Sequence, residues 1–172
     1  CSDCPSVGGD LQNMVCAFDL CGDNWVIDQS YTTPCNFSGC TLEDTYEAVD
    51  HFGAATNGLT PLGNESYAMM GAGPVLGTDH SVSCDGSCGE EDPYSSEGYD
   101  INDVVQWRMI LKAPDEALAF RFKYVFFSEE YDDYISSEFN DKFYVVLEAD
   151  STNDGEPTII NFTSCRDQSA YY

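Results

Sequence analysis

The chain has 172 residues, the length of a single domain. It carries 31 Asp and Glu against six Lys and Arg, a formal net charge of −25, yet 42% of its residues are hydrophobic and 13% are aromatic. That apolar content predicts a folded domain with a core, not a disordered acidic chain. Nucleic acid and anionic membrane surfaces are excluded as partners, because binding them relies on Lys and Arg to neutralise phosphates.

The charge is unevenly distributed along the chain. All six cationic residues follow Trp107, so the first 107 residues hold 18 acidic residues and no Lys or Arg. This region forms no Lys or Arg salt bridge within itself, and its carboxylates repel one another unless something offsets them. Ca²⁺, ambient salt and covalent cross-links are the candidates.

Nine cysteines in a chain of this size predict a disulfide framework made in an oxidising compartment, and therefore a secreted or surface-displayed protein. The sequence has no apolar run of about 18 residues, so we expect no transmembrane helix. It has no charged leader with an apolar segment, so we expect that any signal peptide has been removed.

Nine cysteines can form at most four disulfides within the chain, so one thiol must be accounted for in another way. Cys1 is followed by Ser2, as in a bacterial lipoprotein after cleavage, which predicts a lipid anchor on Cys1. The alternatives are a disulfide at Cys1, or pairing of Cys165 with sequence beyond this chain. The lipid anchor leaves eight cysteines for disulfides, namely Cys4, Cys16, Cys21, Cys35, Cys40, Cys84, Cys88 and Cys165.

Residues 1–42 form a cysteine-rich N-terminal segment with one predicted helix. Asp10 is a suitable N-cap, and we expect the helix to end near residues 21–22. The apolar residues after Asp10 recur at the i, i+3, i+4, i+7 spacing of one helix face. They are Leu11, Met14, Val15 and Phe18.

Residues 43–172 form a β-rich body. A long loop with a local disulfide is expected over residues 81–99, which are rich in Gly, Ser and acids. A turn over residues 112–116 and a hairpin loop over residues 150–156 separate the later strands. Strands are predicted at residues 24–28, 45–52, 66–70, 74–77, 104–111, 117–127, 142–149 and 157–162.

The predicted strand at 117–127 has the clearest alternation. It places Phe120, Phe122 and Tyr124 on one face, with Arg121 and Lys123 on the other. These patterns together predict a mostly β fold over residues 1–172: a disulfide-stapled antiparallel β-sandwich with a short N-terminal helix and long loops.

One stretch resembles a known family. Ser128-Glu129-Glu130-Tyr131 and Phe139-Asn140-Asp141 are similar to the signature of the bacterial choice-of-anchor L domain, in its cysteine-rich deltaproteobacterial branch. The resemblance implies a surface-displayed β-rich module with adhesive or structural roles and no established catalysis. Such domains normally continue beyond the position of Tyr172, so it also implies a C-terminally incomplete body, with a sheet edge open to polymerisation.

The same stretch holds the strongest candidate metal site. Oxygen ligands gathered by one compact turn suit Ca²⁺, which takes six to eight of them. The alternative interpretation is that Glu129 or Asp141 accepts backbone hydrogen bonds and locks the loop. The candidate Ca²⁺ ligands are Glu130, Asp132, Asp133, Asn140 and Asp141.

Other chemistry is weakly indicated. Residues 150–155 mimic the first half of an EF-hand loop, but Asn161 stands where the bidentate Glu belongs, which favours a plain hairpin turn. His51 and His80 are the only histidines, and neither lies in a nucleophile motif. We therefore expect no enzyme.

The sequence predicts a structural or adhesive module that is extracellular or displayed at the cell surface. A subunit of a surface filament is one such module. The alternative is a Ca²⁺-dependent recognition domain that binds a glycan or surface protein. The expected partners are a second copy, another surface protein or a glycan.

Overall fold

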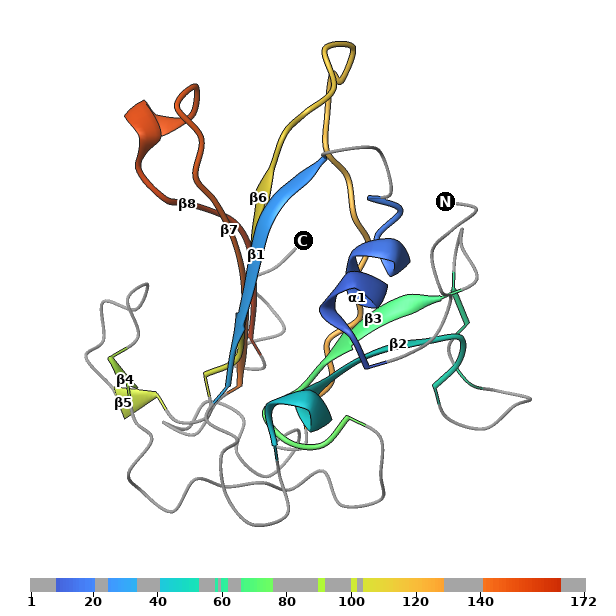
Figure 1. Ribbon diagram of the computed structural model, residues 1–172. Helices are drawn as coiled ribbons and strands as arrows, with labels where there is room; N and C mark the ends of the chain where they lie inside the picture. The colour runs from blue at the N-terminus through green and yellow to red at the C-terminus, as the bar shows by residue number, and fades with distance from the viewer. Residues whose placement is uncertain are drawn as a thin grey trace. The chain divides into compact units, whose positions relative to one another are not determined.

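The computed structural model describes residues 9–20, 25–33, 41–52, 58, 60–61, 66–75, 90–91, 100–101, 104–128 and 141–164 (Figure 1). The chain divides into two compact units, Cys1–Phe120 and Arg121–Tyr172. The described residues are mostly β, in short two-stranded antiparallel sheets, with one short α-helix. This confirms the mostly β class, while the sandwich stays a prediction.

The predicted N-terminal helix is confirmed as α1, Leu11–Ala17. The Asp10 carboxylate caps it by accepting a 2.8 Å hydrogen bond from the backbone N–H of Gln12. The helix ends earlier than predicted because Asp19 has a left-handed backbone, with φ of 61°. Residues 21–22, where the sequence places the end, lie outside the described residues.

Two strands far apart in the sequence form the longest sheet of the first unit. Strand β1, Val26–Thr32, pairs antiparallel with β6, Gln106–Leu111, in a register that sets Tyr31 opposite Trp107. We call this pair the β1–β6 ribbon. Strand β1 extends beyond the predicted residues 24–28 because its Gln-Ser-Tyr-Thr end pairs with β6, a partner that local patterning does not reveal.

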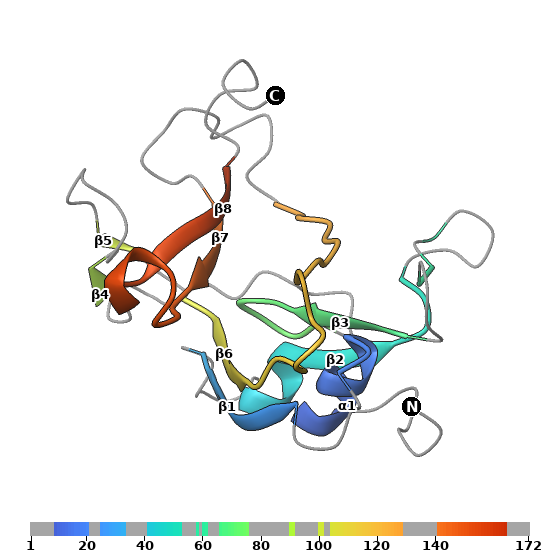
Figure 2. The ribbon, with the colours of Figure 1, turned by 90° about the horizontal axis from the view of Figure 1, so that it is seen from above.

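A second sheet lies under the helix. A 3₁₀ turn, η1 at Leu42–Thr45, leads into β2, Tyr46–Val49, which pairs antiparallel with β3, Tyr67–Met70. Helix α1 packs on both strands (Figure 2). Within the predicted loop 81–99, Glu90–Glu91 is β4, and it pairs with β5 at Asp100–Ile101.

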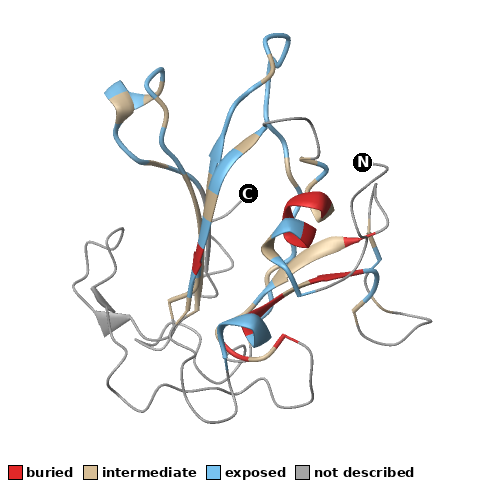
Figure 3. Cartoon of the chain, in the orientation of Figure 1, coloured by how far each residue is buried: buried red, intermediate tan, exposed pale blue. Residues whose placement is uncertain are grey.

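The core of the first unit lies where α1, β1 and β2 meet (Figure 3). Met14, Tyr31 and Tyr46 are 0%, 7% and 5% exposed. Partly buried side chains complete the packing around these three residues, namely Leu11, Ala68, Val105 and Trp107. Phe18, from the predicted helix stripe, contacts the Trp107 ring edge-on, at 5.1 Å between centroids.

The second unit contains the predicted C-terminal hairpin. Strand β7, Lys142–Leu147, pairs antiparallel with β8, Thr158–Ser164. A 3₁₀ turn, η2 at Asn153–Gly155, lies between them and reverses the chain through three consecutive residues with positive φ. This confirms the predicted turn in the EF-hand-like segment.

One predicted strand is wrong, and a second is not found in its described half. The turn at residues 112–116 is present, with a 2.9 Å bond from the Ala117 N–H to the Pro114 carbonyl, but residues 117–128 belong to no strand. Alternation orients side chains, whereas a strand also needs a neighbour to receive its backbone hydrogen bonds, and no described strand pairs with this segment. At 74–77, Pro74 and Val75 are not in a strand, and residues 76–77 lie outside the described part.

Candidate functional site

The two family-like motifs meet at a hydrogen bond in the second unit. The Ser128 hydroxyl donates a 2.5 Å bond to Oδ2 of Asp141. Ser128 is the first residue of the first motif and Asp141 is the last residue of the second, so this bond joins the described ends of the two motifs. The interpretation that Glu129 or Asp141 locks the loop by accepting backbone hydrogen bonds stays a prediction.

Aromatic side chains pack the segment before Ser128 against strand β7. Phe122 contacts Tyr124, and Tyr124 contacts Phe143 on β7, with ring centroids 6.1 and 4.9 Å apart. Phe126 stacks on the same Phe143 ring at 6.2 Å. We call these four residues the aromatic ladder. Phe122 and Tyr124 thus share a side, as the alternation predicts, whereas Phe120, predicted for the same face, is 56% exposed.

The opposite side of the same segment is solvent-exposed. Arg121 and Lys123 are exposed, as the alternation predicts. Val125 and Phe127 continue that side and are 62% and 60% exposed. Two cations followed by two large apolar groups are thus presented to solvent by a segment whose other side packs on β7.

The structure describes one of the five candidate Ca²⁺ ligands. Asp141 is half-buried and bonded to Ser128, while Glu130, Asp132, Asp133 and Asn140 lie outside the described residues. In the described part of the chain, no group of three or more His, Cys, Asp or Glu side chains could hold a metal ion. The Ca²⁺ site stays a prediction.

The structure describes one of the nine cysteines. Cys16 on α1 is 6% exposed and disulfide-bonded. Cys1 and the seven other predicted half-cystines, Cys4, Cys21, Cys35, Cys40, Cys84, Cys88 and Cys165, lie outside the described residues. The lipid anchor and the complete disulfide framework stay predictions.

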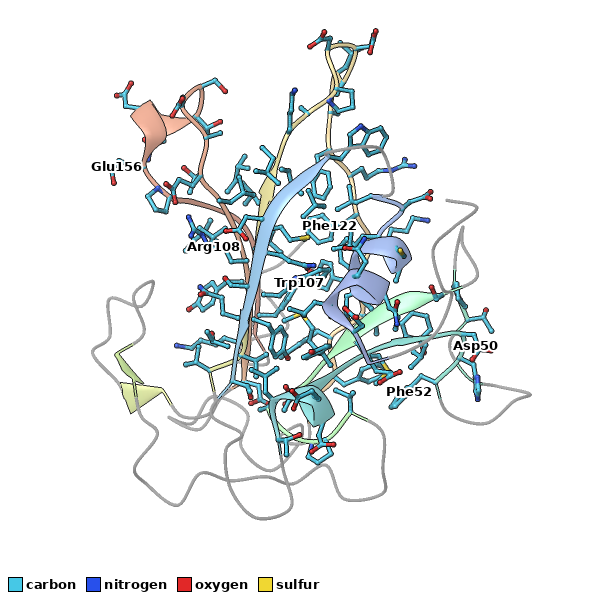
Figure 4. All side chains as sticks on the ribbon, viewed as in Figure 1. Asp50, Phe52, Trp107, Arg108, Phe122 and Glu156 are labelled. Carbon is cyan, nitrogen blue, oxygen red and sulfur yellow. The ribbon has the colours of Figure 1, made fainter. Side chains whose placement is uncertain are left out.

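A histidine–carboxylate pair follows β2 (Figure 4). Nδ1 of His51 lies 2.5 Å from Oδ1 of Asp50, both side chains are exposed, and this hydrogen bond lowers the pKa of Asp50. Nearby, burial raises the pKa of Tyr67, whose hydroxyl is buried without a hydrogen-bond partner in the described structure. Among the described residues the His51 ring bonds only to Asp50, and His80 lies outside them.

Sequence reasoning missed two of these relationships. The Ser128–Asp141 bond spans 13 positions, and no local pattern distinguishes that serine from its neighbours. The adjacency of Asp50 and His51 is visible in the sequence, but their contact depends on side-chain rotamers.

Comparisons of the chain with protein-family models, with curated proteins and with solved structures found no match. The choice-of-anchor L resemblance therefore stays a prediction based on the motifs at residues 128–131 and 139–141. Within the described residues, no helix is long and apolar enough to cross a membrane.

Proposed function

We propose that this chain is an extracellular or cell-surface structural or adhesive module, and that it works as the subunit of a surface filament. The observation that carries the proposal is a set of large apolar side chains that are exposed to solvent. Ile27 on β1 and Val125 in the segment before Ser128 are both 62% exposed, and Phe127 is 60% exposed. Apolar surface of this kind favours contact with a partner.

The extracellular location is supported by cysteine chemistry. Cys16 is disulfide-bonded, and the chain holds eight further cysteines. Disulfides persist in oxidising compartments and are rare in reducing ones. A lipid on Cys1 would anchor the module at a bacterial surface, in keeping with the choice-of-anchor L resemblance.

The charge limits the class of partner. At −25 the chain repels polyanions, which leaves a neutral glycan, a cationic surface or a second copy under screening salt. The exposed Asp50–His51 pair supports no catalytic assignment, because no described nucleophile is bonded to the ring. We therefore propose a binding role without catalysis.

Surface labelling of intact native cells tests the location. A membrane-impermeant amine reagent should label the protein without lysis, and its non-reduced mass should fall below that of the fully reduced chain. Labelling only after lysis, or nine free thiols, would reject the proposal.

Adhesion is tested with protein-coated beads on the same cells. Val125→Ser and Phe127→Ser should reduce bead retention, because both remove exposed apolar contact area. Asp115→Ser, in the exposed turn before the segment, is the matched control and should leave retention unchanged. Equal retention by all three variants would contradict an apolar adhesive surface.

A Ca²⁺-dependent recognition domain is the second candidate. The bond from Ser128 to Asp141 supports it, because hydrogen-bonded carboxylates are typical of metal sites, in which neighbouring groups orient the ligands. Millimolar Ca²⁺ should then raise the Tm, EDTA should reverse the rise, and Asp141→Asn should abolish it. A Tm insensitive to Ca²⁺ and EDTA rejects this candidate and leaves the first standing.

A further inference from the structure

The β1–β6 ribbon has two long edges. In the described part of the chain, β1 pairs with β6 and with no other strand. The strands are seven and six residues long, so each leaves one edge along which no other described strand accepts or donates ladder hydrogen bonds. A two-stranded ribbon is only marginally stable in water, and an open edge is a template for another strand.

The faces of the ribbon restrict how a strand can be added. Tyr31 and Trp107 form an opposed pair on the core face, whereas Ser30 and Arg108 form one on the solvent face. Figure 4 shows Trp107 and Arg108 on opposite sides of the ribbon. Side chains alternate between the two faces, so shifting an added strand by one residue would move its apolar side chains from the core face to the solvent face. The allowed registers therefore differ from one another by two residues.

The edges lack most of the features that block strand addition. Lysine, proline and bulges usually protect an edge, but β6 contains no Pro or Lys and has Arg108 as its single charge. Strand β1 contains no Pro or Lys either and has Asp28 as its single charge. Its bulge lies between Val26 and Asp28, so the pairing from Asp28 to Thr32 is regular.

The two edge strands are also complementary in charge. Arg108 and Asp28 are both exposed, both on the solvent face, and opposite in sign. Neither makes an ion pair within the described residues, where the one recorded pair is Asp50–His51. Opposite charges on neighbouring strands stabilise a sheet, and like charges directly opposite destabilise it.

We propose that β6 of one copy pairs antiparallel with β1 of a second copy, so that Arg108 faces the partner's Asp28. This inference rests on the proposed filament function and names its contact surface. Because the two edges differ, the contact is heterologous: each added copy leaves one β1 edge and one β6 edge open, and assembly continues.

Net charge sets the condition for assembly. Two copies at −25 repel one another at long range, and at about 0.15 M salt that repulsion is screened beyond about 8 Å. Backbone hydrogen bonds and the close Arg108–Asp28 contact act at shorter range. Assembly should therefore appear at about 0.15 M NaCl and disappear at about 0.01 M, where the screening length is about 30 Å.

Charge reversal tests the contact by sedimentation velocity of the full chain at about 0.15 M NaCl, the near-physiological condition. Arg108→Glu alone and Asp28→Arg alone each set like charges opposite one another, and should weaken association roughly tenfold or more. An equimolar mixture of the two variants should restore it, because alternating copies make every contact complementary again. Lys123→Glu changes the net charge as Arg108→Glu does, but lies outside the ribbon, and should leave association unchanged.

The outcomes separate this inference from the proposed function. A monomeric wild type, reversal variants that assemble like wild type, or a mixture that stays dissociated would each overturn the β6–β1 contact. Thermal melts of the single variants show whether loss of assembly reflects unfolding, and restoration in the mixture requires both to be folded. A surface-exposed protein that assembles independently of Arg108 and Asp28 would overturn this inference alone, a surface-exposed monomer would overturn the filament role with it, and a protein labelled only after lysis would overturn the proposed function.

Discussion

The Tyr31 hydroxyl on β1 donates a 2.9 Å hydrogen bond to the backbone carbonyl oxygen of Thr45, the last residue of η1. The same carbonyl accepts a 3.0 Å bond from the Gly71 N–H. The Tyr31 ring packs on Tyr46 with centroids 4.7 Å apart. This contact joins the β1–β6 ribbon to the β2–β3 sheet through one buried hydroxyl.

Replacing that hydroxyl should cost a modest amount of stability. Tyr31→Phe removes the donor, but the Thr45 carbonyl keeps its bond from Gly71, so no buried acceptor is left unpaired. We expect a loss of about 1 kcal/mol in the free energy of unfolding, measured by urea denaturation. A loss above about 3 kcal/mol would show that the hydroxyl supports more than this bond.

Tyr67 provides the opposite case. Its hydroxyl is buried and has no hydrogen-bond partner in the described structure. Tyr67→Phe removes a polar group that pays for its desolvation without a bond in return, so urea denaturation should show stability unchanged or raised by up to about 1 kcal/mol. Destabilisation comparable to that of Tyr31→Phe would mean that the hydroxyl is bonded in solution.

Alkaline pH should destabilise the first unit through Tyr31. Burial raises the pKa of Tyr31 from 10.0 to about 12, so the folded chain keeps a proton that the unfolded chain releases near pH 10. The stability that the protonated Tyr31 hydroxyl contributes is fully present below pH 10 and is lost as the pH rises toward 12. The free energy of unfolding should fall by roughly 2 to 3 kcal/mol across this range. Urea midpoints across this range should fall less steeply in Tyr31→Phe than in wild type.

The Ser128–Asp141 bond should stabilise the second unit. Ser128→Ala removes a donor to a half-buried carboxylate, and we expect a loss of about 1 to 2 kcal/mol in the free energy of unfolding. Ser151→Ala, in the exposed hairpin turn, is the control and should change stability by less than about 0.5 kcal/mol. If the two substitutions lowered the free energy of unfolding equally, Ser128 would have no special structural role.

The aromatic ladder depends on Phe143. Phe143→Ala removes a half-buried ring that contacts both Tyr124 and Phe126, and should cost about 2 kcal/mol. Phe143→Leu keeps apolar volume but loses the ring contacts, so its cost should be about half as large. Near-ultraviolet circular dichroism should lose aromatic signal in both variants, and an unchanged spectrum would contradict the ladder.

Elements with strong local patterns were predictable within a few residues. Helix α1 has a capping Asp10 and an apolar stripe, and β7 begins at Lys142, the first residue of the predicted strand. Strand β1 was recognised in part, because its end at Thr32 depends on pairing with Gln106. The segment 117–127 has the best alternation in the chain and is nevertheless not a strand.

In the candidate site, too, local patterns were predictable and contacts between distant segments were not. The motif beginning at Ser128 and the acid Asp141 were evident in the sequence, and so was the shared face of Phe122 and Tyr124. The bond between Ser128 and Asp141 was not predictable, because it depends on how two separate segments approach one another.

The sequence alone determined the acidity, its separation from the cations, the helix cap and the sides to which alternating residues point. These properties depend on residues a few positions apart, through side-chain chemistry and backbone periodicity. Only the tertiary structure decided that β1 pairs with β6, that Tyr31 reaches Thr45 and that Asp141 receives Ser128. Backbone ladders and buried hydrogen bonds need a partner from elsewhere in the chain, and which partner arrives is settled by the packing of the whole core.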